Sequence, residues 1–107
     1  MQANVDEILR ALRSEGGYGG RIVVVTYYAL EYTGFQAAGT QQLNSGLASA
    51  ATANGATVAS GYEAFRPAAE QSGGNPTQAG LVRPDDVHPT ERGQQLLAEA
   101  VETVVPR

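Results

Sequence analysis

The chain has 107 residues, a net charge of −4 and no cysteine. This length predicts a single domain, residues 1–107, and the absence of cysteine excludes disulfides and thiolate chemistry. The acidic residues are scattered, and the sequence has neither a basic stripe nor a basic amphipathic segment. We therefore expect neither nucleic acid nor a membrane surface as a partner.

The N-terminal segment predicts an amphipathic helix. Asn4 and Glu7 have the spacing of a capping box, and Gly16-Gly17 would end the helix. The apolar positions of one face are Val5, Ile8, Leu9 and Leu12. This acidic segment does not resemble a secretory signal, and no apolar run reaches the length of a membrane helix. All seven basic residues are arginine, which with abundant alanine and glycine indicates a bacterial, GC-rich coding sequence.

Two short apolar runs, 22–27 and 56–60, predict strands, with a helix over about 38–53 between them. Runs without alternation are typical of strands covered on both faces, and a strand–helix–strand order predicts a parallel crossover. A turn or short helix is expected over 62–65. The stretch 67–84 is rich in Gly, Pro, Asn and Gln and predicts a long loop.

A last amphipathic helix is expected over 90–104, closed by Pro106. The element order predicts an α/β fold, in the form of a partial three-layer α/β/α domain with a short parallel sheet. Two strands alone do not make a stable open sheet. We therefore expect self-association into a homo-oligomer that completes the sheet.

The only histidine, His88, follows Asp85 by three residues, between the loop and the last helix. A carboxylate can accept the Nδ1 proton of the ring, which leaves Nε2 free as a base. Asp86 is the alternative carboxylate if the turn is built differently. The segment could instead be an ordinary helix cap with an unused histidine. A metal site of Asp85, Asp86 and His88 is less favoured because no second histidine is available, so we expect neither metal nor cofactor.

The segment DDVHPTERGQQLLAEAV resembles the C-terminal block of SGNH, or GDSL-type, hydrolases, in which D-x-x-H-P precedes a glycine and the last helix. Asp85, His88, Pro89 and Gly93 match that pattern. The resemblance implies a truncated, flavodoxin-like domain and hydrolysis of a small carboxylic ester through an acyl-enzyme. His88 would be the general base and Asp85 its orienting carboxylate.

The family's G-D-S serine block is absent from this sequence, so no residue matches the nucleophile. Ser60, at the end of the second strand, and Ser72, in the loop, are the two candidates to test. Tyr27, Tyr28 and Tyr32 could line an acyl pocket, or they could simply cap a sheet edge. The alternative function is an inactive remnant of the fold that self-associates or binds a partner.

Overall fold

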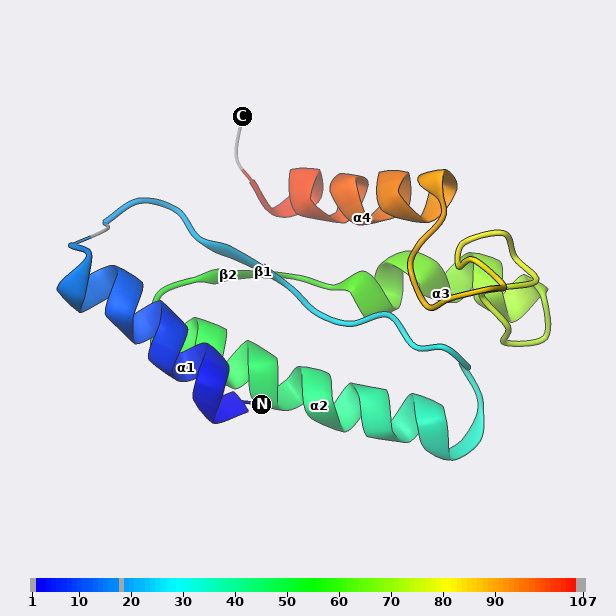
Figure 1. Ribbon diagram of the computed structural model, residues 1–107, viewed down its shortest axis with the longest axis horizontal. Coiled ribbons are helices and arrows are strands. Elements are labelled where there is room, and N and C mark those ends of the chain that lie inside the picture. The colour runs from blue at the N-terminus through cyan, green and yellow to red at the C-terminus, as the bar shows by residue number, and fades with distance from the viewer. Residues whose placement is uncertain (1, 18, 106–107) are drawn as a thin grey trace.

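The computed structural model describes residues 2–17 and 19–105, so Pro106 lies outside the described residues. The elements are α1 (Gln2–Arg10), the π-helical turn η1 (Ala11–Glu15), β1 (Val23–Val25), α2 (Gly34–Ala53), β2 (Thr57–Ala59), α3 (Gly61–Gln71) and α4 (Glu91–Val104). Helices and a short parallel sheet make a small α/β fold, as the sequence predicted (Figure 1). None of the helices in these residues is both long and apolar enough to cross a membrane.

The sheet consists of β1 and β2, which pair in parallel with α2 as the connection between them. The Thr57 N–H donates to the Ile22 carbonyl at 2.8 Å, and the Thr26 N–H donates to the Ala59 carbonyl at 3.0 Å. Both strands are shorter than the runs 22–27 and 56–60 that predicted them. Apolar composition marks where a strand can form, but only residues opposite a partner join the ladder.

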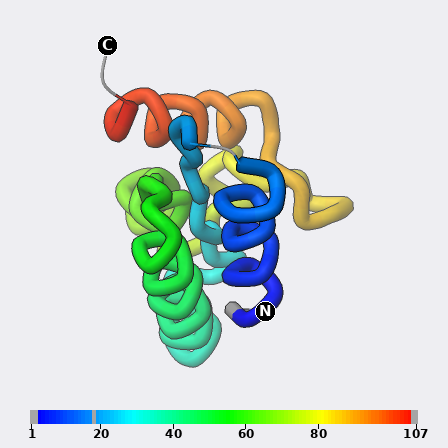
Figure 2. Tube along the Cα trace, turned by 90° about the vertical axis from the view of Figure 1, so that its left-hand side faces the viewer, coloured from blue at the N-terminus to red at the C-terminus, as the bar shows by residue number. Residues whose placement is uncertain are grey.

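Helices lie on more than one side of the strands. Figure 1 shows α4 above them and α2 below, and Figure 2 shows α1 and α2 to either side of the line of β1. α1 packs against α2 and buries Leu9. A second apolar cluster, beneath α4, is formed by Phe65 with Leu81 and Val82, and it fixes the chain just before α4.

α1 differs from its prediction in two ways. It begins at Gln2, so Asn4 lies inside the helix and is not its N-cap. Glutamine and alanine are good helix formers, which allows the helix to start before the capping-box residues. In addition, only part of the predicted apolar face is covered, because Ile8 is 60% and Leu12 43% exposed. The stop at Gly16 is confirmed, and its N–H donates to the Ala11 carbonyl at 2.8 Å.

α3 is longer than predicted, because it continues through Pro67 where a loop was expected. Its N-cap is Ser60, whose Oγ accepts the Glu63 N–H at 3.0 Å. This is the Ser-x-x-Glu spacing of a capping box, and it was present in the sequence. Pro67 removes one helical donor, but the following turn buries Ala69, and that packing retains the helix. The prediction of a loop from residue 67 was therefore wrong over one helical turn.

Candidate active site

The segment between α3 and α4 places His88 at the base of a closed loop. Val82 and Pro89 form an antiparallel bridge. The Arg83 N–H donates to the His88 carbonyl at 3.0 Å, which closes the loop 83–88. Thr90, the residue after Pro89, is the N-cap of α4, and its hydroxyl accepts the Gly93 N–H at 3.1 Å. The backbone of His88 is thus fixed, although the side chains of the loop are exposed.

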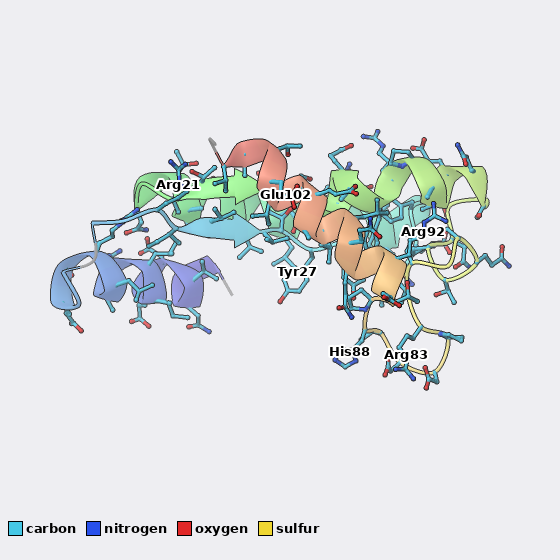
Figure 3. All side chains as sticks on the ribbon, turned by 90° about the horizontal axis from the view of Figure 1, so that it is seen from above. Arg21, Tyr27, Arg83, His88, Arg92 and Glu102 are labelled. Carbon is cyan, nitrogen blue, oxygen red and sulfur yellow. The ribbon has the colours of Figure 1, made fainter. Side chains whose placement is uncertain are left out.

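The carboxylate beside the imidazole is that of Asp86. Its Oδ1 accepts the His88 N–H at 2.9 Å, which is an Asx turn, and its Oδ2 lies 3.4 Å from Nδ1. Nε2 is on the opposite side of the ring, and the His88 side chain is 79% exposed (Figure 3). Asp86 therefore occupies the orienting position that the sequence assigned first to Asp85. The Asx turn explains this, because it holds a carboxylate two residues before the histidine.

Asp85 faces Arg83 instead of the histidine. The guanidinium donates through Nε to Oδ1 at 3.2 Å and through Nη2 to Oδ2 at 3.1 Å. These hydrogen bonds lower the pKa of the Asp85 carboxyl from its ordinary value. Arg83 Nε also lies 4.0 Å from Asp86 Oδ1. Within residues 2–17 and 19–105, no three acidic or histidine side chains are grouped so that they could hold a metal ion.

Tyr28 ties the histidine loop to the chain beyond β1. Its hydroxyl donates to the Val87 carbonyl, and its ring stacks on Phe65 with centroids 4.6 Å apart. Burial raises the pKa of Tyr28, and the nearby charge of Asp86 adds to the rise. The Tyr28 hydroxyl therefore stays protonated and remains a hydrogen-bond donor to Val87, the residue before His88.

An apolar groove of about 490 Å³ lies beside this loop. Its lining residues come from the segment after β1, from the first half of α2 and from the histidine loop: Tyr27, Tyr28, Leu30, Gln36, Gly39, Thr40, Leu43 and Val87. Two of the three tyrosines expected at a pocket line it. The third, Tyr32, instead donates its hydroxyl to the Tyr62 carbonyl at 2.8 Å and packs against the Tyr62 ring. Val87 lines the groove, whereas His88, the next residue along the chain, is not among the lining residues and its side chain is exposed.

Neither candidate serine meets the imidazole. The Ser60 hydroxyl is occupied by the cap of α3, and this residue lines a different cavity, between α3 and α4. Ser72 is the C-cap of α3. In the described part of the chain no hydrogen bond joins either hydroxyl to His88. The structure thus brings a carboxylate to the histidine but not a serine.

Asn44 is a buried residue of this region that sequence reasoning missed. Its Oδ1 accepts the Tyr27 N–H at 2.9 Å, and its Nδ2 donates to the Tyr27 carbonyl at 2.8 Å. These bonds attach the wall of the groove to α2. The available signal was an amide placed among the apolar positions of a helix, beside Leu43 and near Leu47.

Compared with known proteins, the chain matches no protein-family model, no curated protein and no solved structure. Function is therefore inferred from the geometry of the His88 loop and of the groove that Val87 lines.

Proposed function

We propose that this domain hydrolyses small carboxylic esters, with His88 as the general base and Asp86 as its orienting carboxylate. The observation that carries the proposal is the position of Asp86 Oδ2, 3.4 Å from Nδ1 of an exposed ring, in a loop whose Val87 lines an apolar groove. A negative charge at Nδ1 favours the tautomer that carries the proton there and stabilises the imidazolium that forms during catalysis. Nε2 is then left as the base.

The groove supplies the apolar contact that an ester's acyl chain requires. Leu30, Leu43 and Val87 contribute aliphatic walls, and Tyr27 and Tyr28 contribute aromatic ones. A short acyl chain lying in the groove would place its carbonyl carbon near the His88 loop. We infer a preference for butyrate over acetate esters, because each additional buried methylene contributes about 0.8 kcal/mol.

Water is the nucleophile that this arrangement favours, since in the described part of the chain no hydrogen bond joins a serine hydroxyl to the ring. Nε2 removes a proton from water as its oxygen bonds to the ester carbonyl carbon. The tetrahedral intermediate then expels the alcohol, which takes the proton back from the imidazolium. A well-placed general base contributes about 10²–10⁴-fold in rate, so slow turnover of activated esters is expected.

The experiment is hydrolysis of p-nitrophenyl acetate and butyrate by the protein and by His88→Ala. We expect the wild-type rate to exceed that of an equal concentration of free imidazole, and the His88→Ala rate to equal buffer. A fluorophosphonate probe should leave Ser60 and Ser72 unlabelled. If His88→Ala is as active as the wild type, the proposed function is wrong. Labelling of either serine would instead indicate that this serine, and not water, is the nucleophile and that the reaction passes through an acyl-enzyme.

The SGNH relationship belongs to this proposal. The Asp–x–x–His–Pro segment and the glycine in the first turn of α4 support a three-layer α/β/α lineage. The second candidate function, an inactive self-associating domain, is favoured by a different observation: among the described residues, β1 pairs with β2 and with no strand on its other edge. A protein without His88-dependent turnover that forms oligomers would support that candidate.

A further inference from the structure

The free edge of β1 presents unpaired backbone groups. Ile22 and Thr26 direct their backbone hydrogen bonds toward β2. Because successive residues of a strand point their N–H and C=O groups in opposite directions, Val23 and Val25 direct theirs away from β2. Among the described residues these groups have no hydrogen-bond partner. Such an edge is a template for a further strand.

The chain from Ile22 to Leu30, which includes this edge, carries no charged side chain, although the charged Arg21 stands directly before it. The segment 22–30 contains no charged residue and no proline, which are the usual features that prevent edge pairing. Val25 is 42% and Tyr27 49% exposed. Figure 3 shows Tyr27 and α1 on the same side of β1. α1 itself carries two exposed apolar side chains, Ile8 and Leu12.

The exposed area supports a partner of ordinary size. The chain exposes 6535 Å², whereas a compact globular protein of 11.2 kDa exposes about 5,700 Å². The excess of about 800 Å² is summed over the whole surface of the chain, and it is similar in size to the ~800 Å² that each partner contributes to a standard interface. The radius of gyration, 14.7 Å, also exceeds the value of about 13 Å expected for 107 residues.

We infer that this edge binds β1 of a second copy, antiparallel about a twofold axis at Val24, to give the sheet β2–β1–β1–β2. In this register Val23 lies opposite the partner's Val25, and Val25 opposite the partner's Val23. The backbone N–H and C=O groups of Val23 and Val25 point toward the partner. Each of the two opposed pairs therefore forms two hydrogen bonds, which makes four in the dimer. An edge that is complementary to itself across a twofold axis gives a closed dimer.

Two features select this edge and limit the pairing. The outer side of β2 is flanked by Glu63 and Glu99, which line the cavity that contains Val58. A twofold axis there would bring like charges together, whereas the segment 22–30 carries none. At the end of β1, Asn44 already occupies the backbone of Tyr27, so the new ladder ends before that residue. The dimer does not depend on the His88 chemistry.

The test is the mass of the protein by sedimentation equilibrium from about 1 μM to about 1 mM, a range that covers weak and tight dimers. We expect a dimer for the wild type and a monomer for Val25→Lys, because a lysine on an edge strand blocks pairing. Phe35→Lys is the matched control. Phe35 is 96% exposed and lies outside the edge, so this variant should remain dimeric.

A second measurement uses only the wild-type protein, so it does not require that a variant folds. In the dimer, the Val23 and Val25 amides are hydrogen-bonded, so their hydrogen exchange should slow as protein concentration rises. The amide of Phe35 should not change. A wild-type protein that is monomeric at every concentration overturns the inference. So does a dimer that Phe35→Lys dissociates and Val25→Lys does not, which would place the interface at the start of α2.

Discussion

Asn44 forms with Tyr27 the pair of hydrogen bonds that a neighbouring strand would otherwise make, at 2.9 Å to the N–H and 2.8 Å to the carbonyl. Replacing Asn44 by alanine leaves both partly buried backbone groups without partners. We expect Asn44→Ala to lower the free energy of unfolding by about 2 kcal/mol, measured by urea denaturation. Gln41→Ala, at an exposed position of the same helix, is the control and should change stability by less than about 0.5 kcal/mol. Equal stability of the two variants would show that the amide pair contributes nothing.

Gly93 is required by a close approach between α4 and the chain before it. A Cβ atom at this position would overlap the Leu81 carbonyl oxygen and touch the Phe65 ring. We expect Gly93→Ala to destabilise the protein by about 1–3 kcal/mol, the usual effect of overpacking. Gly39→Ala is the matched control, because a Cβ there meets nothing within 4 Å and lies inside α2. That variant should stabilise by about 0.5–1 kcal/mol. Thermal unfolding of both variants tests the contrast.

The sequence predicted the elements that are marked by residues close together in the chain, such as apolar runs, helical spacing and glycine stops. The β1–α2–β2 order follows from two apolar runs and the helical pattern between them, and the parallel pairing confirms it. The stop of the first helix follows from Gly16, which caps it. The cap of α3 had a local signal in Ser60 and Glu63. The end of α3 has no such signal, because the helix continues past Pro67 through the packing of Ala69.

The site was harder to predict, because distant contacts decide its geometry. The sequence identified His88 and offered two carboxylates for it, and spacing alone could not choose between them. Arg83 resolves the choice by holding Asp85, while the Asx turn brings Asp86 to the ring. The hydrogen bond from Tyr28 to Val87 joins positions 59 apart in the chain, and no local pattern predicts such a contact.

Tyr28 should rigidify the histidine loop through its hydroxyl. Tyr28→Phe keeps the ring stack on Phe65 but removes the donor to the Val87 carbonyl. We expect a loss of about 0.5–1.5 kcal/mol of stability and faster hydrogen exchange in residues 86–88. Tyr27→Phe is the control, because the Tyr27 ring is half exposed and its backbone, not its hydroxyl, makes the bonds to Asn44. If the amides of residues 86–88 exchange equally fast in both variants, the Tyr28 hydroxyl does not hold the loop.

Stability should fall at alkaline pH because of two partly buried tyrosines, Tyr28 and Tyr32. Burial raises the pKa of both Tyr28 and Tyr32 above 10.0, so the folded chain holds these protons more tightly than the unfolded chain. Their contribution is complete below about pH 10 and is lost as the pH rises through the raised values. The chain has no lysine and no cysteine that would titrate in the same range. The urea midpoint should decline above pH 10 in the wild type and decline less in Tyr32→Phe. A parallel decline would exclude Tyr32 as the cause.

The two aspartates of the histidine loop should differ in their effect on ester hydrolysis. Asp86→Asn keeps an oxygen that can accept the His88 N–H, so the Asx turn is retained, but it removes the negative charge that lies 3.4 Å from Nδ1. Without that charge the imidazolium formed in the transition state is less stable, and we expect the His88-dependent rate to fall about tenfold. Asp85→Asn weakens only an exposed pair with Arg83, and its rate should stay within about twofold of the wild type.

The measurement is kcat/KM for p-nitrophenyl butyrate, with the His88→Ala rate subtracted as background. Circular dichroism and the urea midpoint of each variant separate a loss of chemistry from a loss of fold. If Asp85→Asn reduces the rate and Asp86→Asn does not, the carboxylate that acts on the imidazole is Asp85. The loop must then rearrange when substrate binds, because in the free protein Asp85 is held by the Arg83 guanidinium on the outer side of the loop.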